Sequence, residues 1–354
     1  MRNKKLSNYI IFAMMLTFIP LDGFCISQEE PQSNPPLKSA ASPIVLSYGT
    51  LMPEIHFLSQ ADNNVLAEIE RRTNGMVKFK TYFGGSLISG KGALEKLKTG
   101  VCDIANVIPD YEPSMLLSKG QRGFWYGCSV ENALAIYNVV CSKIPEIETE
   151  WADVMVLSLA NMPGYQLLTT KRPVRKLEDF RGLRLKCLSN HIGPLKDLGA
   201  EGIVMPVSDV YISLQKGIID GVIMSYDTLK SFHLSELIKY ATRIDFFPGP
   251  FPNKAMNQDS FDKLPTEIQK VFKGIREFWS FESERISMES MQKGLDAGKM
   301  GGVEFIELQP DELYKIYKLC DAVALEDAAK LDAKGLPGTK VFKEIRYLVQ
   351  EYHK

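Results

Sequence analysis

Two cations leave the same side of a short apolar segment in the stretch 179-DFRGLRLKCLSN-190. Apolar residues alternate there with Arg184 and Lys186, which is the periodicity of a β-strand. Because side chains two residues apart share one face of a strand, both cations are placed together near its carboxyl end. Such a position is either solvated or holds an anionic ligand. Lys186 and Arg184 are the two candidates for such a contact, and the strand pattern alone leaves both alternatives open.

Groups suited to covalent or metal chemistry are sparse. The four histidines show neither HExxH nor a paired spacing, and no GxSxG elbow occurs. The Gly-rich turn 84-GGSLISG-90 lacks the lysine of a phosphate-binding loop. Asp103 and Asp220 are isolated carboxylates at the starts of expected strands, where capping or pairing is commoner than catalysis. The sequence therefore predicts a binding protein, not an enzyme, with no metal and no cofactor.

The six cysteines form no CxxC pair and no Cys/His cluster, which argues against a metal site. Cys128 and Cys141 flank an expected helical segment, 129–140, of about 18–20 Å at 1.5 Å per residue. That separation disfavours a disulfide between them. We expect most of the cysteines to be buried free thiols.

The first 27 residues differ from the rest of the chain. Three cations precede the apolar run 9-YIIFAMMLTFIPL-21, and small residues follow it, which is the order of a secretory signal peptide. The run is short for a membrane span, which needs about 20 residues. We expect cleavage after Ser27 or after Cys25, with lipid attachment at Cys25 as an alternative. Residues 28–43 then form a polar, Pro-rich tether, and the mature protein lies in the periplasm.

Length and composition fit a globular protein of two domains. The chain has 354 residues, of which 45% are hydrophobic and 24% are charged. Its formal net charge is -1, so no basic field indicates a nucleic-acid partner.

Strands and helices alternate along the mature chain, which predicts an α/β fold of two lobes with a central cleft. The first half predicts strands over 44–50, 76–83 and 101–107, with helices over 58–73 and 91–100 between them, in the β-α-β-α-β order of a parallel sheet. The second half predicts strands over 164–170, 183–188, 202–206, 220–226 and 240–247, with helices over 191–199, 209–217 (capped by Ser208) and 228–238. A long helical pattern from Pro265 to Gly298, roughly 50 Å, is expected to brace both lobes. A strand near 303, a helix from Pro310 and a last amphipathic helix complete the chain.

Several motifs resemble the solute-binding proteins of tripartite ATP-independent periplasmic (TRAP) transporters. They occur in this order along the chain: 73-TNGMVKFKTYFGGSL-87, 94-LEKLKTGVCDIA-105, 179-DFRGLRLKC-187, 197-DLGAEGIVMPVSDVYISLQKGIIDG-221, 236-ELIKY-240, 257-NQDSFDKLPTEIQ-269 and 335-GLPGTKVFKEI-345. The resemblance covers nearly all of residues 44–354 and is specific through the combination, order and spacing of the motifs.

The resemblance implies a receptor whose two lobes close over a small organic solute, commonly an organic acid, and then deliver it to a membrane permease. It places 44–163 plus about 248–280 in lobe I, and 164–247 plus about 281–354 in lobe II. A monomer is expected. Three alternatives stay open: delivery to a periplasmic sensor kinase, a degenerate module that scavenges apolar compounds, and a hydrolase on the same scaffold.

The resemblance also implies a set of ligand-binding positions. Lys186 occupies the place of an arginine that forks onto the ligand carboxylate, although lysine offers a point charge and not two parallel donors. Gln166 stands where members that bind sialic-acid-like ligands have a second arginine. Met224 replaces an asparagine, Ile223 a cation-binding glutamate and Val207 an aromatic residue.

These replacements remove directional polar groups and add apolar ones, so a monocarboxylate or a weakly charged compound with an aromatic or branched body is expected. The layout of the family's first lobe adds three further candidates at the rim of the cleft: Trp125, His56 and Tyr111.

Overall fold

The structure, a computed structural model, describes residues 42–352. The expected signal peptide, the tether and Cys25 lie outside this range. All of the described residues belong to one compact unit. None of their helices has the length and apolar character needed to cross a membrane.

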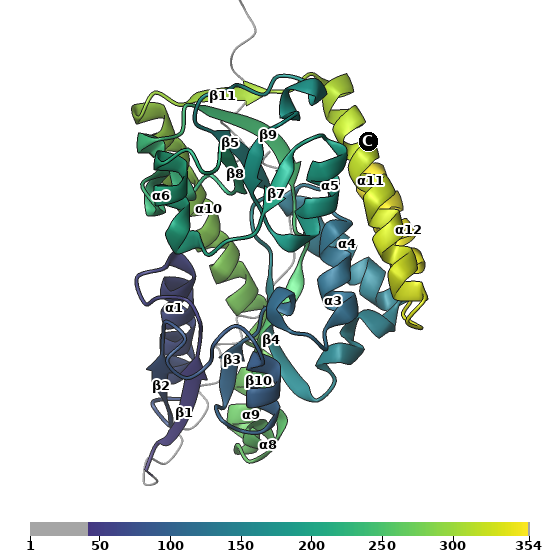
Figure 1. Cartoon of the computed structure of the whole chain (residues 1–354). Helices are drawn as coiled ribbons and strands as arrows, with labels where there is room; N and C mark the ends of the chain where they lie inside the picture. Colours follow the sequence, from purple (N-terminus) through teal and green to yellow (C-terminus); the bar gives the residue numbers. More distant parts are fainter. Residues whose placement is uncertain (1–41, 353–354) are drawn as a thin grey trace, which may run out of the picture. The chain divides into compact units, whose positions relative to one another are not determined.

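The first of two sheets has five strands in the order β2-β1-β3-β10-β4 (Figure 1). They are β1 (Ile44–Gly49), β2 (Val77–Tyr82), β3 (Ile104–Asn106), β4 (Val154–Ala160) and β10 (Phe251–Asn257). β1 pairs in parallel with β2 and β3, as the alternating pattern predicted. β10 arrives from a distant part of the chain and runs antiparallel to both β3 and β4, so the complete sheet is mixed. The sequence reading did not assign β4 or β10 as strands.

The second sheet has six strands in the order β11-β9-β5-β8-β6-β7. They are β5 (Tyr165–Thr169), β6 (Arg184–Lys186), β7 (Glu201–Ile203), β8 (Gly221–Met224), β9 (Tyr240–Phe246) and β11 (Glu304–Glu307). β6 lies between β8 and β7, and Lys186 pairs with Val222 on one side and Ile203 on the other. Lys186 is therefore on an internal strand and not at an edge of the sheet.

Twelve α-helices of the described chain pack around these sheets (Figure 1). They are α1 (Phe57–Arg72), α2 (Ala93–Lys98), α3 (Leu116–Gly120), α4 (Val130–Lys143), α5 (Ile192–Asp197), α6 (Val210–Gln215), α7 (Thr228–Ser231), α8 (Gln258–Asp262), α9 (Thr266–Lys273), α10 (Arg276–Met300), α11 (Pro310–Asp332) and α12 (Gly338–Glu351). α1 shows why such segments are helical: its apolar residues recur three and four positions apart, and that face is buried against α10 and the first sheet.

The long helix expected from Pro265 is two helices, which corrects the sequence reading. α9 ends at Lys273, before Gly274, a residue with a low helix propensity, and α10 begins at Arg276. α10 has 25 residues and is therefore about 37 Å long, not 50 Å. It packs on α1 and β4 beside the first sheet and on α7 beside the second. Gly294 permits the contact with α7, because a Cβ there would lie 2.0 Å from the Tyr226 carbonyl oxygen.

Two further details differ from the sequence reading. Ser208 does not cap α6, because its hydroxyl bonds to the Asp209 carboxylate and Asp209 itself precedes the first helical residue. The C-terminal helices also contact more than one region: α12 packs on α4, while α11 contacts α3 and α5. The proposed boundaries of the lobes remain a prediction.

Candidate functional site

Lys186 is a largely buried residue whose ammonium group has no partner among the described residues. Its side chain is 7% exposed, and within residues 42–352 it makes no hydrogen bond and no ion pair. Burial lowers the pKa of Lys186, and the neighbouring Cys187 opposes this only in part. A buried ammonium costs free energy unless an anion or acceptors surround it. The position is therefore suited to a bound anion.

A second cation, Arg122, lies close by but is already paired. It is 5% exposed, and its Nε lies 2.7 Å from Oδ2 of Asp110. Its guanidinium also covers the ring of Phe251 at 4.1 Å from the ring centroid. Nη1 of Arg122 is buried and has no hydrogen-bond partner among the described residues. One donor of this arginine thus remains available.

His191 lies near both cations, since each of them lowers its pKa. It is the last residue of the 3-10 helix Ser189–His191, which precedes α5 and packs against the 3-10 helix Gln121–Gly123 that carries Arg122. Burial, together with the charges of Lys186 and Arg122, lowers the pKa of His191 to about 3. The imidazole is therefore neutral at physiological pH. Its Nδ1 is buried without a hydrogen-bond partner in the described chain.

Aromatic rings surround this histidine. Tyr165 meets it edge-on at 6.1 Å between ring centroids, and Phe246 lies at 5.4 Å and Tyr126 at 6.5 Å. Burial raises the pKa of Tyr165, while Arg122 opposes the shift. Tyr165 is therefore uncharged as well.

We call the group formed by Asp110, Arg122, Tyr165, Lys186, Asn190 and His191 the polar cluster. Asn190 is included because it precedes His191 in the turn Ser189–His191, and both polar atoms of its side-chain amide are buried without a described partner. Asp110 balances Arg122, and the tyrosine and histidine are neutral, so Lys186 leaves the cluster with one uncompensated positive charge. The arrangement can hold one anionic group beside flat apolar surfaces.

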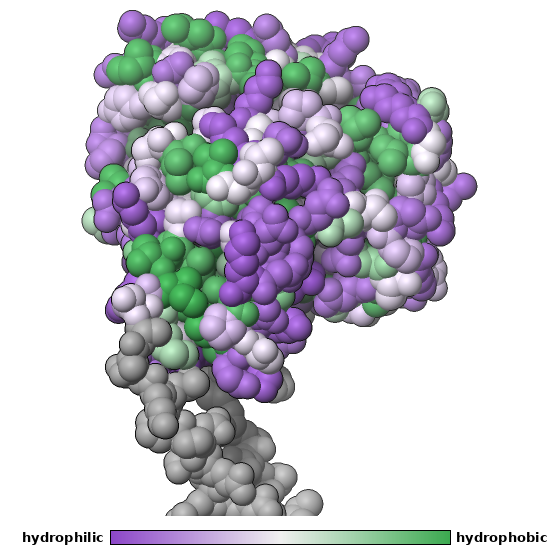
Figure 2. All heavy atoms as spheres, turned by 90° about the horizontal axis from the view of Figure 1, so that it is seen from below, coloured by the Kyte–Doolittle hydropathy of each residue, from purple (hydrophilic) through white to green (hydrophobic). Residues whose placement is uncertain are grey.

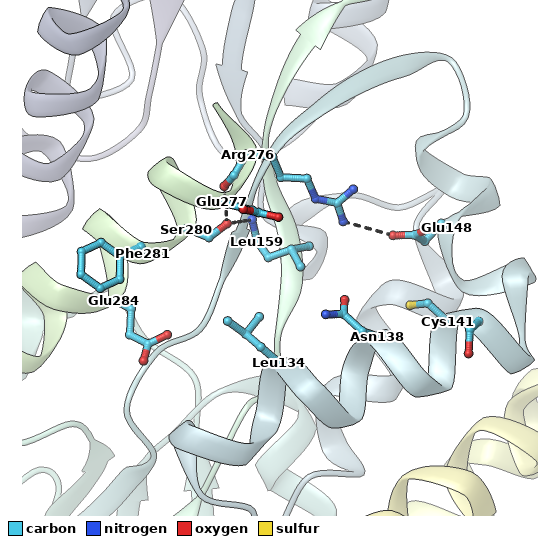
Figure 3. A pocket seen from close by; sticks show the side chains of 11 residues that line it. Leu134, Asn138, Cys141, Glu148, Leu159, Arg276, Glu277, Ser280, Phe281 and Glu284 are labelled. Carbon is cyan, nitrogen blue, oxygen red and sulfur yellow. Dashed lines mark hydrogen bonds and ion pairs between the residues drawn. The ribbon is translucent and has the colours of Figure 1, made fainter. Parts of the chain in front are cut away.

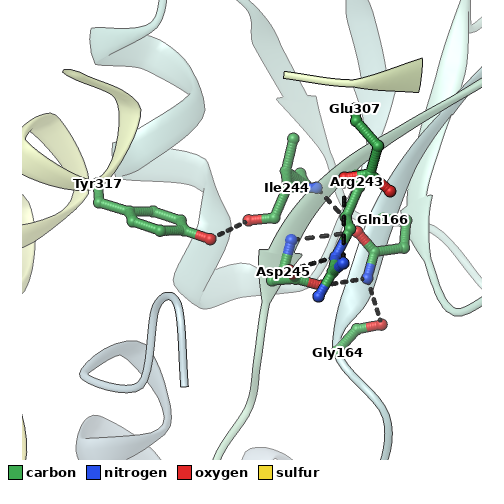
Figure 4. A network of polar contacts seen from close by, with 7 residues as sticks. All are labelled: Gly164, Gln166, Arg243, Ile244, Asp245, Glu307 and Tyr317. Atoms are coloured by element: carbon green, nitrogen blue, oxygen red, sulfur yellow. Dashed lines mark hydrogen bonds and ion pairs between the residues drawn. The ribbon is translucent and has the colours of Figure 1, made fainter. Parts of the chain in front are cut away.

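Gln166 follows Tyr165 of the cluster on β5, but its side-chain amide bonds to β9 (Figure 4). Its Nε2 donates to Asp245 Oδ1 at 2.8 Å, and its Oε1 accepts from the backbone N–H of Ile244 at 2.8 Å and of Asp245 at 3.1 Å. These bonds hold an irregular part of the β5–β9 pairing, where Asp245 has a φ of 43°. Gln166 thus supports the strand that carries Tyr165.

Arg184 is separated from Lys186 although both lie on one strand. Its guanidinium makes a two-pronged ion pair with Asp220, with N–O distances of 2.9 and 3.1 Å, and also donates to the Gly217 carbonyl. Arg184 is the first cause of the lowered pKa of Asp220. The isolated carboxylate of the sequence is therefore a pairing partner, as its pattern indicated.

The three apolar candidates do not share one environment. Ile223 is 1% exposed in the core that includes Leu185, whereas Met224 is 9% exposed and faces the core on the other side of the sheet. Val207 is 37% exposed in the turn before α6.

The candidates from the first half also differ in position. Tyr111 is half exposed and lies near Tyr165, whose pKa it raises. Trp125 is completely buried in a core formed with α4, α11 and α12. His56 precedes α1, where its Nδ1 accepts from the N–H of Leu58 at 3.2 Å.

The sequence reading missed Arg122, Tyr165 and His191 as members of a site. Arg122 and His191 are 69 positions apart, and no local pattern connects them. The available signal was a lone arginine in the apolar stretch 121-QRGFWYGC-128 and a lone histidine next to the strand that carries Lys186.

A cavity of about 630 Å³ lies elsewhere, between α4 and α10 (Figure 3). Its charged lining is mostly acidic, with Glu148, Glu277 and Glu284 against one cation, Arg276, which pairs with Glu148 at 3.4 Å. An organic anion would be repelled there, so volume alone does not identify the site. The charge of the polar cluster does favour an anion.

The face in Figure 2 shows hydrophobic side chains in separate groups among hydrophilic ones. Among the described residues, no group of three or more histidine, cysteine, aspartate or glutamate side chains is placed to hold a metal ion. The five cysteines of this range are free, and four of them are buried.

Comparison with known proteins identifies the class. Residues 143–330, more than half of the chain, match the family of bacterial extracellular solute-binding proteins, family 7 (DctP), and the chain belongs to that family. It is 23% identical over 298 residues to a solute-binding protein of Albidiferax ferrireducens, covering 79% of this chain and 83% of the relative. It is 24% identical over 296 residues to the C4-dicarboxylate-binding periplasmic protein DctP of Rhodobacter capsulatus, covering 77% and 82%.

Solved structures agree. A TRAP periplasmic solute-binding protein from Desulfovibrio salexigens superimposes with a TM-score of 0.75 at 26% identity, covering 88% of this chain and 97% of the other. A TRAP solute-binding protein from Rhodoferax ferrireducens, in complex with copurified benzoate, gives a TM-score of 0.73 at 19% identity, covering 88% and 98%. The resemblance and the two-lobed α/β fold class are thus confirmed. The protein is a TRAP-type solute-binding receptor for small organic acids, and not an enzyme.

Proposed function

We propose that this receptor captures a monocarboxylate with an aromatic or branched apolar body and delivers it to a TRAP membrane permease. The observation that carries the proposal is Lys186, a cation that is 7% exposed and has no partner within residues 42–352. A ligand carboxylate would supply the missing negative charge. The free donor Nη1 of Arg122 would supply a second hydrogen bond to it.

Charge balance favours one carboxylate over two. The polar cluster carries one uncompensated positive charge, since Arg122 is paired with Asp110 at 2.7 Å. A dicarboxylate would leave its second negative charge in a region where Tyr165 and His191 are neutral. Burial of that second charge without a partner would cost several kcal/mol.

The aromatic rings favour a flat apolar body. Tyr165, Phe246 and Tyr126 lie within 6.5 Å of the His191 ring, measured between centroids. Aromatic rings pack against one another edge-on or offset at such distances. Among the solved relatives, one was crystallised with benzoate and one from Bordetella bronchiseptica with mandelate. These two relatives, at 19% and 20% identity, are examples of aromatic monocarboxylates bound on this fold.

Delivery to a permease follows from the family and is part of the proposal, as are a monomeric state and location in the periplasm. The alternative of a sensor kinase as partner also stays a prediction. Neither the cation that some members hold beside a keto acid nor any cofactor is needed for the proposed contacts.

Isothermal titration calorimetry on the exported full-length protein tests the ligand class. We expect benzoate to bind, and succinate and neutral benzamide to bind at least about tenfold more weakly. Lys186→Met should weaken benzoate binding at least about 30-fold, because truncating one partner of a buried charge pair costs 2 kcal/mol or more. Lys196→Met, on the exposed side of α5, is the matched control and should bind normally. Tighter binding of succinate than of benzoate would refute the proposal.

A further inference from the structure

The polar cluster contains more unpartnered groups than a single carboxylate can satisfy. Besides Arg122 Nη1, the buried atoms without a described hydrogen-bond partner include Asn190 Oδ1, Asn190 Nδ2 and His191 Nδ1. Leaving a buried donor or acceptor unsatisfied costs about 1–3 kcal/mol, and native structures contain few such groups. Three of them on two adjacent residues therefore point to a second part of the ligand.

The chemistry of these atoms specifies that part. An amide offers donors and an acceptor, and a neutral imidazole offers one of each. His191 stays neutral because burial lowers its pKa to about 3. Neutral groups that both donate and accept match a hydroxyl, which also does both. A second carboxylate only accepts hydrogen bonds, so it would leave Asn190 Oδ1 and the acceptor nitrogen of the imidazole unpaired.

The positions of Asn190 and His191 suit a ligand that carries a substituted aromatic ring. The turn Ser189–His191 begins three residues after Lys186 and packs against the segment that carries Arg122. The His191 ring packs against Tyr165 and Phe246, and it is close enough to Lys186 and Arg122 for both cations to lower its pKa. A ligand ring beside these aromatic residues, with its carboxylate on Lys186, could present a hydroxyl to the turn.

We propose that Asn190 and His191 form a subsite for a hydroxyl group on the ring or side chain of an aromatic monocarboxylate. This inference rests on the proposed function, because it adds a second recognised group to the same ligand. The receptor would then discriminate hydroxylated aromatic acids from their unsubstituted parents. Such discrimination arises because the parent acid would leave the buried polar groups unpaired.

Two pairs of acids test the subsite: benzoate against 3- and 4-hydroxybenzoate, and phenylacetate against mandelate. Calorimetry on the full-length protein should show that at least one hydroxylated acid binds about tenfold or more tightly than its parent. His191→Phe keeps an aromatic ring of similar size and removes both nitrogens. We expect it to reduce that preference, measured as the ratio of the two affinities in the same variant, to within about threefold.

His191 is buried, so the folding of His191→Phe is checked by circular dichroism and thermal melting. Asn190→Ala is a second variant that leaves the buried histidine in place. It should remove part of the preference. Asn138→Ala, an exposed asparagine on α4, is the matched control and should keep the whole preference.

The outcomes separate the two proposals. Equal binding of hydroxylated and parent acids, with loss of both in Lys186→Met, overturns the hydroxyl subsite and leaves the proposed function standing. A preference that survives in both His191→Phe and Asn190→Ala overturns the assignment to these residues. No binding of any of the acids by the wild-type protein overturns the proposed function and the subsite together.

Discussion

Two buried lysines, one on each sheet, differ in whether a carboxylate pairs with them. Lys254 on β10 is 1% exposed, and its Nζ lies 3.1 Å from Oδ2 of Asp62. Asp62 also accepts hydrogen bonds from the Tyr48 hydroxyl and, at 2.9 Å, from Trp279 Nε1. Lys186 on β6 is 7% exposed and has no such partner in the described chain. Lys254 is thus paired with a carboxylate that has further hydrogen bonds, which we call the closed network. Lys186 has no counter-ion among the described residues, and we call its surroundings the open region.

The difference separates a structural role from a binding role. The Asp62 network joins β1, α1, β10 and α10, so it fixes the first sheet against the helix that contacts both sheets. Lys186 fixes nothing comparable, and burial lowers its pKa instead. In the proposed function, a ligand carboxylate stabilises this charge.

The largest expected effect is the loss of stability when Lys254, the lysine of the closed network, is replaced. Lys254→Met should lower the free energy of unfolding by about 3–5 kcal/mol, because it leaves the Asp62 carboxylate buried without a counter-ion. Urea unfolding followed by circular dichroism measures the change. The double variant Asp62→Asn/Lys254→Met should recover more than half of the loss, since the amide oxygen still accepts from Trp279. A loss of less than about 1 kcal/mol in the single variant would show that the pair is not structural.

A fall in pH should lower the free energy of unfolding in part through His191, in the open region. His191 has a folded-state pKa of about 3, below its usual value, so the unfolded chain takes up a proton first as the pH falls below about 6.5. Stability from this residue is complete above pH 6.5 and is lost progressively as the pH falls toward 3. Between pH 7 and 4.5 the wild-type protein should lose about 2–3 kcal/mol more than His191→Asn.

The same urea titrations at both pH values measure this difference. His56, whose pKa burial lowers to about 4, contributes to the acid sensitivity of both proteins and cancels in the comparison. An identical loss in wild type and His191→Asn would contradict the buried, neutral state of His191.

Replacement of the unpaired lysine should have a smaller effect on stability. Lys186→Met removes a buried charge and leaves no carboxylate behind, so without ligand the free energy of unfolding should change by less than about 1 kcal/mol or rise. This contrasts with Lys254→Met under the same conditions. A destabilisation of more than about 2 kcal/mol would mean that Lys186 has a structural function and would remove the contrast.

The smallest effect is a shift in alkaline pH dependence. The free-state pKa of Lys186 lies below the usual lysine value of 10.5, so affinity for a carboxylate should fall as the pH rises through that lowered value. Only the protonated lysine offers a charge, and the loss approaches tenfold per pH unit above the pKa. Lys186→Arg stays charged and should show no such fall. Calorimetry from pH 7 to 10 compares the two proteins, and parallel curves would contradict the assignment.

The sequence alone determined the elements that depend on local pattern. Alternation of apolar and polar residues located β1, β2, β3, β5 and β6, and a helix from Pro310 was confirmed at α11. The motif order identified the family, and Lys186 emerged from the strand period together with the resemblance. These features are readable because they depend on residues close together in the chain.

Other features required the tertiary structure. β4 and β10 pair over a separation of about 100 residues, and the break between α9 and α10 combines a glycine with the packing of Ile275 into the core. Gln166 looks free in sequence, yet its amide is occupied by the backbone of β9. No local rule predicts such long-range partners, because hydrogen-bond satisfaction is decided only when distant strands meet.

The site shows the same division. The sequence determined that a cation stands on β6 and that it is lysine, since strand period and residue type are local properties. Only the tertiary structure decided that Lys186 is unpaired while Lys254 is paired, and that Arg122 and His191 lie beside it. The physical reason is that burial and counter-ions depend on which distant segments exclude water from a charge, and those segments are brought together by folding.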